Sequence, residues 1–443
     1  MHRLLGRGFG GGFGRRVTGA RRWLGAGLGV LLAASVVGGS VVLDAAPAHA
    51  DQIRDLEYWL GDYGFADAWN TTRGAGVTVA VIDTGIDSSV AELAGVVVGG
   101  TDVSGLGSAN GQKPVGSDAQ DSSHGTMVAS LLAGRGTGDG AGLVGVAPEA
   151  NLLSVSVAFG ESASTVSNDD QIAEGIRWAV DNGADVINMS LTRNTLFWPE
   201  SWDDAFLYAF ENDVVVVAAA GNRGSGTTEV GAPATIPGVL TVAGVDRNKT
   251  ASFDASSQGI TISVAAPSEQ LVGAVPGGGY VLWDGTSAAA PIVSGLVALV
   301  RAQFPNLSAA EVMNRVIASA NPDGRSVPSP IYGNGLIDAL GAVTASVPAA
   351  TVQPPTELLA EWIRLHRRAD LDVQPTETPS VVTPNVPTKD PTVPGQNIAS
   401  AWLPNQLSLT YISLPLAVLV GFGILLVMLG IGATRHFRQI RRK

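Results

Sequence analysis

Four polar side chains of this sequence have the types needed for nucleophilic attack on a carbonyl group. They are Asp83 before Thr-Gly, His124 before Gly-Thr, Asn222 after Ala-Ala-Ala-Gly, and Ser287 after Gly-Thr. A serine hydroxyl can attack, a histidine can take its proton, a carboxylate can orient that histidine, and an amide can donate to the oxyanion. Each residue also has a structural interpretation: a turn Asp, a structural His, a turn Asn and a Ser that caps a core helix.

Short apolar runs rich in β-branched residues predict strands buried on both faces, at 77–82, 152–157, 186–189 and 214–220. Helical stretches lie between them: one from near Ser123 through Leu132, one after 168–170 that ends near 182–183, and one over 202–212. This alternation predicts an α/β fold with a doubly wound, mainly parallel sheet and helices on both faces. Asp83 and Asn222 then follow strands at the functional edge of the sheet, while His124 and Ser287 start helices.

The composition excludes several classes of chemistry. The chain has no cysteine, so thiol nucleophiles, disulfides and cysteine metal sites are absent. Of its five histidines only His124 falls in the globular pattern, which argues against a zinc hydrolase. Calcium could bind the Asp-bearing loops 104–120 and 134–142, but neither has a recognisable ligand spacing. We therefore expect no cofactor and no metal.

Charge and hydropathy predict membrane targeting at both ends. Residues 1–50 carry six Arg, an apolar stretch and a final Ala-His-Ala, which indicates a signal peptide cut after Ala50. An uncleaved anchor is the alternative, and Arg21-Arg22 leaves twin-arginine export open beside the general route. Tyr411 to Ala433 is long and apolar enough to span a bilayer; the alternative is a buried soluble helix.

The last nine residues, 435–443, carry five positive charges and follow the predicted span of 411–434 directly. The positive-inside tendency places this tail in the cytoplasm and the acidic globular part outside the cell membrane. The whole chain has a formal net charge of −12 although both ends are basic, so its middle is strongly acidic, which argues against nucleic acid as a partner.

The remaining segments complete the predicted organisation. Residues 51–76 form an N-terminal extension that packs on the domain, and residues 77–347 form the domain itself. Residues 348–410 form a Pro/Thr-rich linker. Within the linker a helical stretch, 357–369, puts four apolar side chains on one face that docks on the domain or on a partner: Leu358, Leu359, Trp362 and Leu365.

The stretches 83–87, 124–129, 218–222 and 285–291 resemble, in order, the four signature blocks of subtilisin-like serine proteases. The resemblance covers about residues 53–345. It implies that Ser287 is the nucleophile, His124 the general base and then acid, Asp83 its orienter and Asn222 the oxyanion donor. It also implies a substrate-lining set: Ser190, Leu191, Thr192, Ala219, Ala220 and Gly221. Thr192 stands where the family commonly has glycine, and its side chain narrows the expected cleft.

The whole layout is similar to the mycosins of actinobacterial type VII secretion, in its short extension, Pro-rich linker and C-terminal anchor. Mycosins often carry cysteines, and this chain has none. The similarity implies a membrane-anchored, extracytoplasmic endopeptidase that cleaves exported proteins and has the secretion membrane complex as partner. Two alternatives stay open: a structural subunit of that complex with proteolysis secondary, and a general degradative protease held at the surface.

Overall fold

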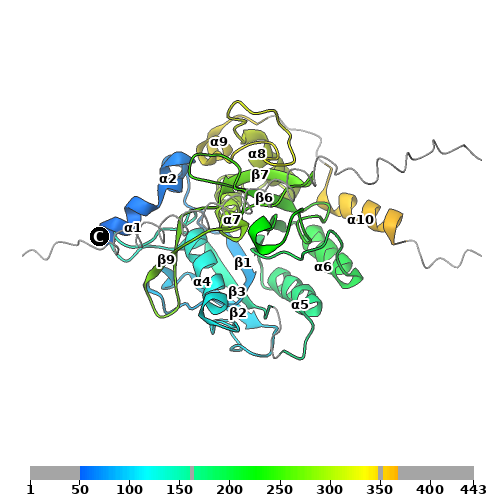
Figure 1. Ribbon diagram of the computed structural model, residues 1–443, viewed down its shortest axis with the longest axis horizontal. Coiled ribbons are helices and arrows are strands. Elements are labelled where there is room, and N and C mark those ends of the chain that lie inside the picture. Colours follow the sequence, from blue (N-terminus) through cyan, green and yellow to red (C-terminus); the bar gives the residue numbers. More distant parts are fainter. Residues whose placement is uncertain (1–49, 160–163, 348–352, 368–443) are drawn as a thin grey trace, which may run out of the picture. The chain divides into compact units, whose positions relative to one another are not determined.

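The computed structural model describes residues 50–159, 164–347 and 353–367, which belong to one compact unit (Figure 1). The predicted signal peptide, most of the linker, the apolar stretch 411–434 and the basic tail lie outside the described residues. Among the helices of the described ranges, none is both long and apolar enough to cross a bilayer.

A seven-stranded parallel sheet forms the centre of the unit, in the order β2-β3-β1-β4-β5-β6-β7. The chain starts in the middle with β1 and winds outward in both directions, so the predicted doubly wound sheet is confirmed. The strands are β1 (Thr78–Asp83), β2 (Val97–Asp102), β3 (Asn151–Ser156), β4 (Val186–Met189), β5 (Val215–Ala219), β6 (Leu240–Val245) and β7 (Ile262–Pro267). β1, β3, β4 and β5 match the predicted apolar runs to within one residue at each end.

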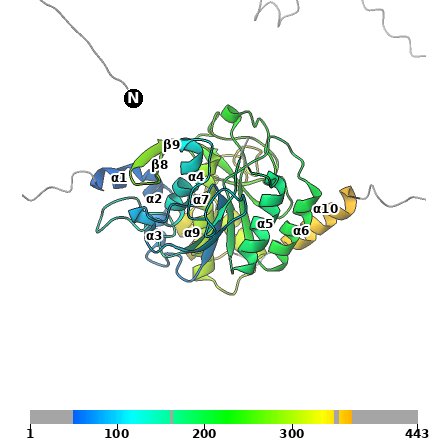
Figure 2. The same cartoon turned by 90° about the horizontal axis from the view of Figure 1, so that it is seen from below.

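Helices cover both faces of the sheet, as the alternation predicts. α4 (Ala119–Ala133) and α7 (Thr286–Gln303) pack together on one side, and α5 (Asn168–Asp181) and α6 (Glu200–Glu211) pack together on the other (Figure 2). α8 (Ala309–Ser319) and α9 (Ala339–Thr344) flank α7. α7 is buried almost all round from Ala288 to Val300, which explains why its sequence is apolar without a polar stripe.

One helix boundary differs from the sequence expectation. α4 begins at Ala119, so His124 is not at its start but in its second turn. The reason is the cap: the Asp118 carboxylate accepts hydrogen bonds from the backbone N–H groups of Gln120 and Asp121, at 2.8 and 3.0 Å. The polar end of the predicted loop thus supplies the first turn of the helix.

A two-stranded antiparallel hairpin, which the sequence analysis did not identify, packs on α4. Its strands are β8 (Leu271–Ala274) and β9 (Tyr280–Trp283). The connection contains three successive glycines, 277–279, all with positive φ, a conformation that favours glycine. β9 ends only four residues before Ser287, so the hairpin lies beside the predicted nucleophile.

The N-terminal extension lies on the domain as three short helices: α1 (Ala50–Leu56), α2 (Tyr58–Asp62) and α3 (Phe65–Ala68). The side chains of Trp59 and Phe65 are fully buried in the common core. The backbone carbonyl of Tyr63 accepts a hydrogen bond from the N–H of Ala339, at 2.9 Å, which joins the extension to α9.

Helix α10 (Pro355–His366) lies in the segment predicted as linker, and it packs on α6. Only part of the predicted apolar face is docked. Leu359 is fully buried, and the ring of Trp362 lies 4.1 Å from that of Trp198. Leu358 and Leu365 are 36% and 48% exposed, because they lie on another side of the helix.

Candidate active site

Asp83 and His124 form a direct pair. Asp83 ends β1 with a fully buried carboxylate, and its oxygens lie 2.8 and 3.0 Å from His124 Nδ1. A carboxylate only accepts, so Nδ1 carries the proton and donates, which leaves the Nε2 lone pair free. The Asp83 Oδ1 atom also accepts from the N–H of Thr84, at 2.7 Å, which fixes the carboxylate.

A close approach of two backbones holds this pair together. The N–H of Gly125 donates to Thr84 Oγ1 at 3.0 Å, and a Cβ added at Gly125 would lie 2.3 Å from the carbonyl oxygen of Gly85. Only glycine permits α4 to come this near to the end of β1. The approach sets the distance between Asp83 and His124.

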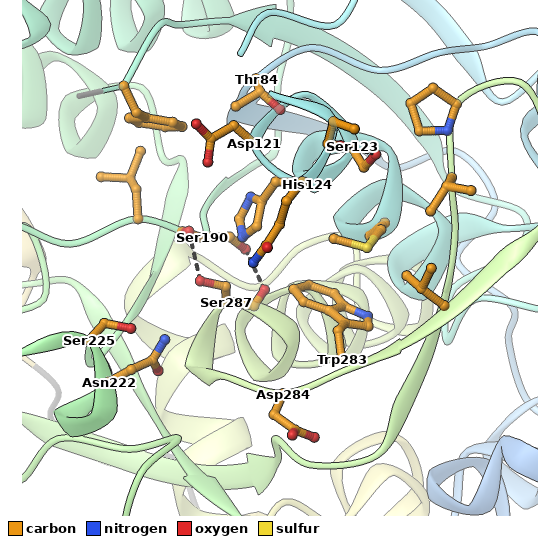
Figure 3. A pocket seen from close by; sticks show the side chains of 18 of the residues that line it. Thr84, Asp121, Ser123, His124, Ser190, Asn222, Ser225, Trp283, Asp284 and Ser287 are labelled. Atoms are coloured by element: carbon orange, nitrogen blue, oxygen red, sulfur yellow. Dashed lines mark hydrogen bonds between the residues drawn. The ribbon is translucent and has the colours of Figure 1, made fainter. Parts of the chain in front are cut away.

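Ser287 is the second residue of α7 and borders the same cavity as His124 (Figure 3). Its Oγ donates to the backbone carbonyl of Ser190 at 3.1 Å, and Ser190 Oγ donates to the carbonyl of Ser287 at 2.8 Å. Within the described part of the chain, Ser287 Oγ makes no hydrogen bond to His124. The Ser287 hydroxyl is thus paired with a backbone carbonyl, and His124 lines the same cavity.

The Asn222 side chain has a fixed orientation. Its Oδ1 accepts from the N–H and the hydroxyl of Thr286, at 2.8 and 2.9 Å. The Nδ2 group is thereby turned away from these two donors, and it makes no hydrogen bond among the described residues. Asn222 lines the cavity that Ser287 borders, so its amide is available to an oxygen bound there.

The cavity has a volume of about 1170 Å³ and lies between α4, the hairpin and the start of α7. Of the predicted substrate-lining residues, Ser190, Leu191 and Thr192 line it. Thr192 therefore does present a side chain to the cavity wall. Ala219, Ala220 and Gly221 are buried behind Asn222 and are not among the lining residues of the described chain.

Sequence reasoning missed several lining residues. They are Gln120 and Asp121 from α4, Phe159 after β3, and Val281, Leu282, Trp283 and Asp284 at the end of the hairpin. The ring of Trp283 meets that of His124 edge-on, with centroids 5.6 Å apart. The nearness of Trp283 and Asp284 to Ser287 in the sequence was a usable signal, whereas Phe159 reaches the cavity only through the tertiary fold.

Electrostatics favour the protonated form of His124. Burial lowers the pKa of the imidazole, but the Asp83 carboxylate, with a smaller contribution from Asp121, outweighs burial and raises the pKa above its ordinary value. A neutral His124 accepts a proton at neutral pH, and the carboxylates stabilise the imidazolium that results.

Over residues 50–159, 164–347 and 353–367, no three carboxylate or imidazole side chains are grouped as metal ligands. At the end of β2, directly before the first of the two Asp-bearing loops, the Asp102 carboxylate accepts hydrogen bonds from Ser104, Gly107 and Ser156. The expectation of no metal or cofactor stays a prediction.

Comparison with known proteins agrees with this geometry. Residues 74–335 match the subtilase family. Subtilisin DY of Bacillus licheniformis is 38% identical over 273 residues, which cover 61% of this chain and 92% of the relative.

Among solved structures, the MycP3 protease from the type VII (ESX-3) secretion system is similar, with a TM-score of 0.55 and 32% identity over 65% of this chain and 88% of its own. MycP1 from Mycobacterium smegmatis is similar with a TM-score of 0.56 and 32% identity, over 67% and 87%. The resemblance to subtilisin-like proteases, and to mycosins among them, is therefore supported. The chain belongs to the subtilase family and is a serine endopeptidase.

Proposed function

We propose that Ser287, His124 and Asp83 act as the catalytic triad of this endopeptidase and that Asn222 donates to the oxyanion. The observation that carries the proposal is the pairing of the buried Asp83 carboxylate with His124 Nδ1 at 2.8 Å, beside a cavity that Ser287 also borders. This pairing leaves Nε2 as the proton acceptor on the cavity side of the imidazole.

In the acylation step, Ser287 Oγ attacks the scissile carbonyl carbon while its proton passes to His124 Nε2. The carbonyl oxygen becomes an oxyanion, which accepts hydrogen bonds from Asn222 Nδ2 and from the N–H of Ser287. This N–H lies in the first turn of α7 and has no acceptor among the described residues. His124 then gives its proton to the leaving amine as the C–N bond breaks. Water, deprotonated by His124, releases the acid and returns Ser287 to its hydroxyl form.

The test is labelling of the full-length, detergent-solubilised protein with a fluorophosphonate probe. We expect wild type to react and both Ser287→Ala and His124→Ala to remain unlabelled, because the probe needs an activated serine. A Ser190→Ala variant is the control, because Ser190 is a second serine of the cavity wall and contacts Ser287. We expect it to be labelled, and loss of labelling in Ser190→Ala together with labelling of Ser287→Ala would show that the nucleophile is wrongly assigned. Folded wild-type protein that fails to react overturns the proposal.

We further propose that the enzyme is anchored in the cell membrane through residues 411–434, with its protease domain outside the cytoplasm, and that it processes proteins exported by type VII secretion. Support comes from the apolar stretch with its basic tail and from similarity to the MycP1 and MycP3 proteases. The test is secretion in the host cell. Loss of substrate processing in Ser287→Ala supports the enzymatic role, whereas unchanged processing contradicts it.

A further inference from the structure

The charges around the active-site cavity are all of one sign. Two carboxylates, Asp121 and Asp284, line the cavity, and neither lysine nor arginine occurs among its described lining residues. Both side chains are exposed to solvent, so both can meet a bound peptide. The rest of the lining is polar and uncharged or apolar, with His124 as the remaining titratable group.

The two carboxylates lie on opposite sides of the catalytic pair. Figure 3 shows Asp121 beyond His124 on one side and Asp284 beyond Trp283 and Ser287 on the other. Asp121 precedes His124 by three residues on α4, and Asp284 precedes Ser287 by three residues at the end of the hairpin. A peptide bound in this cavity with its scissile bond at Ser287 therefore lies between two negative charges of the cavity wall.

One hydrogen bond holds each of the two side chains in place. Asp121 Oδ2 accepts from the hydroxyl of Ser117, and Asp284 Oδ1 accepts from the N–H of Gln270. Each carboxylate keeps its second oxygen free, and within the described chain neither forms a salt bridge. The charge of Asp121 also acts on the reacting groups, since it contributes to the raised pKa of His124.

The apolar part of the cavity rim affects which peptides can bind. Val281 and Leu282 on β9 are 41% and 57% exposed, and Phe159, which follows β3, is 36% exposed and lines the same cavity. Exposed apolar side chains on a cleft favour apolar groups on the ligand. A peptide with a cationic side chain beside its scissile bond and with apolar side chains at other positions is complementary to this surface.

We propose that Asp121 and Asp284 are specificity-determining residues, which select peptides with a lysine or arginine next to the scissile bond and reject peptides with an acidic residue there. The proposal rests on the function proposed above. Each exposed carboxylate changes the interaction with a charged side chain only a few-fold, but attraction of a cation and repulsion of an anion act together. We expect kcat/KM for a lysine peptide to exceed that for its glutamate analogue about tenfold at low salt.

The experiment uses the full-length enzyme in detergent and a peptide series built on its own preferred cut. Casein is digested, and mass spectrometry identifies the site cut most rapidly. Internally quenched peptides of that site are made with Lys, Gln or Glu, in turn, at the two residues on each side of the scissile bond. The kcat/KM ratio of Lys to Glu peptides is measured in about 20 mM and about 500 mM NaCl.

Three results are expected. The ratio falls toward one at high salt, because exposed charges are screened. In the double variant Asp121→Asn/Asp284→Asn, the Lys-to-Glu ratio at low salt falls to about two or less, because asparagine keeps the hydrogen bonds but not the charge. It is unchanged in Asp204→Asn, a control that removes one exposed charge from α6 on the other side of the sheet. The acid limb of the pH profile moves to lower pH in Asp121→Asn and not in Asp204→Asn.

A wild-type ratio near one at low salt overturns the inference, as does a ratio that survives either the double substitution or high salt. The salt measurement needs no variant, so a ratio that survives high salt contradicts the proposal even if the double variant does not fold. The single variants Asp121→Asn and Asp284→Asn then assign the charge effect, since each should lower the ratio. Failure of the proposed function looks different: the enzyme then cuts none of the peptides and does not react with the fluorophosphonate.

Discussion

Thr286 holds Asn222 with two hydrogen bonds, one from its N–H and one from its hydroxyl, and the same hydroxyl accepts from the N–H of Gly221 at 3.1 Å. The residue before the proposed nucleophile thus fixes the proposed oxyanion donor. It does so from a fully buried position, where no water replaces a lost partner.

This arrangement predicts the effect of Thr286→Val. The change leaves the buried N–H of Gly221 unpaired and Asn222 held by one bond, so we expect the free energy of unfolding to fall by about 1–3 kcal/mol. We also expect kcat to fall more than KM rises, because the lost orientation affects the transition state. Thr286→Ser keeps the hydroxyl and should restore kcat. Equal activity of the Val and Ser variants would show that the hydroxyl has no such role.

Gly125→Ala tests the close approach of α4 to β1. The added methyl would lie 2.3 Å from the Gly85 carbonyl oxygen, so the helix must move and carry His124 away from Asp83. We expect the free energy of unfolding to fall by about 1–3 kcal/mol. We also expect a large loss of fluorophosphonate labelling. Gly61→Ala is the matched control: its methyl meets nothing within 4 Å, and in α2 it should stabilise by about 0.5–1 kcal/mol. Unchanged labelling in Gly125→Ala would contradict the argument.

The sequence was most informative where one physical pattern dominates. Val215 to Ala219 is a short run rich in valine, which predicts a buried strand, and the mainly apolar run after Ser287 is long enough to predict a buried helix. The start of α4 was placed four residues late, because its cap, Asp118, lies among Gly, Ser and Asp residues typical of a loop. Local propensity cannot show that this aspartate accepts hydrogen bonds from two backbone N–H groups.

Tertiary contacts account for what the sequence could not supply. The hairpin strands have only four residues each, too few for a clear alternation, and β9 is ordered by its pairing with β8. Trp283 becomes a neighbour of His124 only when the hairpin packs on α4. On α10, the spacing of the apolar residues alone did not show that Leu359 faces the domain while Leu358 and Leu365 face away from it.

The pH dependence of catalysis follows from the Asp83–His124 pair. His124 must be neutral to accept a proton, and its pKa is raised because Asp83 and Asp121 outweigh burial. We therefore expect kcat/KM to rise with pH, with an acid limb above the ordinary pKa of about 6.5. Asp83→Asn should move that limb to lower pH and reduce the plateau. The protonated imidazole also stabilises the fold below pH of about 6.5, and this contribution disappears as pH rises through the raised pKa. A limb that does not move in Asp83→Asn would refute the coupling.

Glu57 predicts a second pH effect, on stability. Burial raises the pKa of this carboxyl to about 8, although the N–H of Val144 and the charge of Arg54 oppose the shift. The folded state thus holds a proton that the unfolded state has released above a pH of about 4.5, so stability falls as pH rises from there to about 8. We expect Glu57→Gln to flatten this decline in urea unfolding measured across that range. Glu174→Gln, an exposed change on α5, should leave the decline as in wild type. A steep decline that persists in Glu57→Gln would mean that another group causes it.

Docking of α10 can be tested with two leucines of the same helix. Leu359 is fully buried against the domain, so Leu359→Ala leaves a cavity, and we expect the free energy of unfolding to fall by about 2–5 kcal/mol. Leu365 is 48% exposed, so Leu365→Ala should change the free energy of unfolding by no more than about 0.5 kcal/mol. Both are measured by urea unfolding of the full-length protein. The ion pair of Arg367 with Asp203, at 2.8 Å, adds a contact at the end of the same helix. If both variants were equally stable, α10 would not be docked on α6 in solution, and the segment would act as the linker that its sequence predicts.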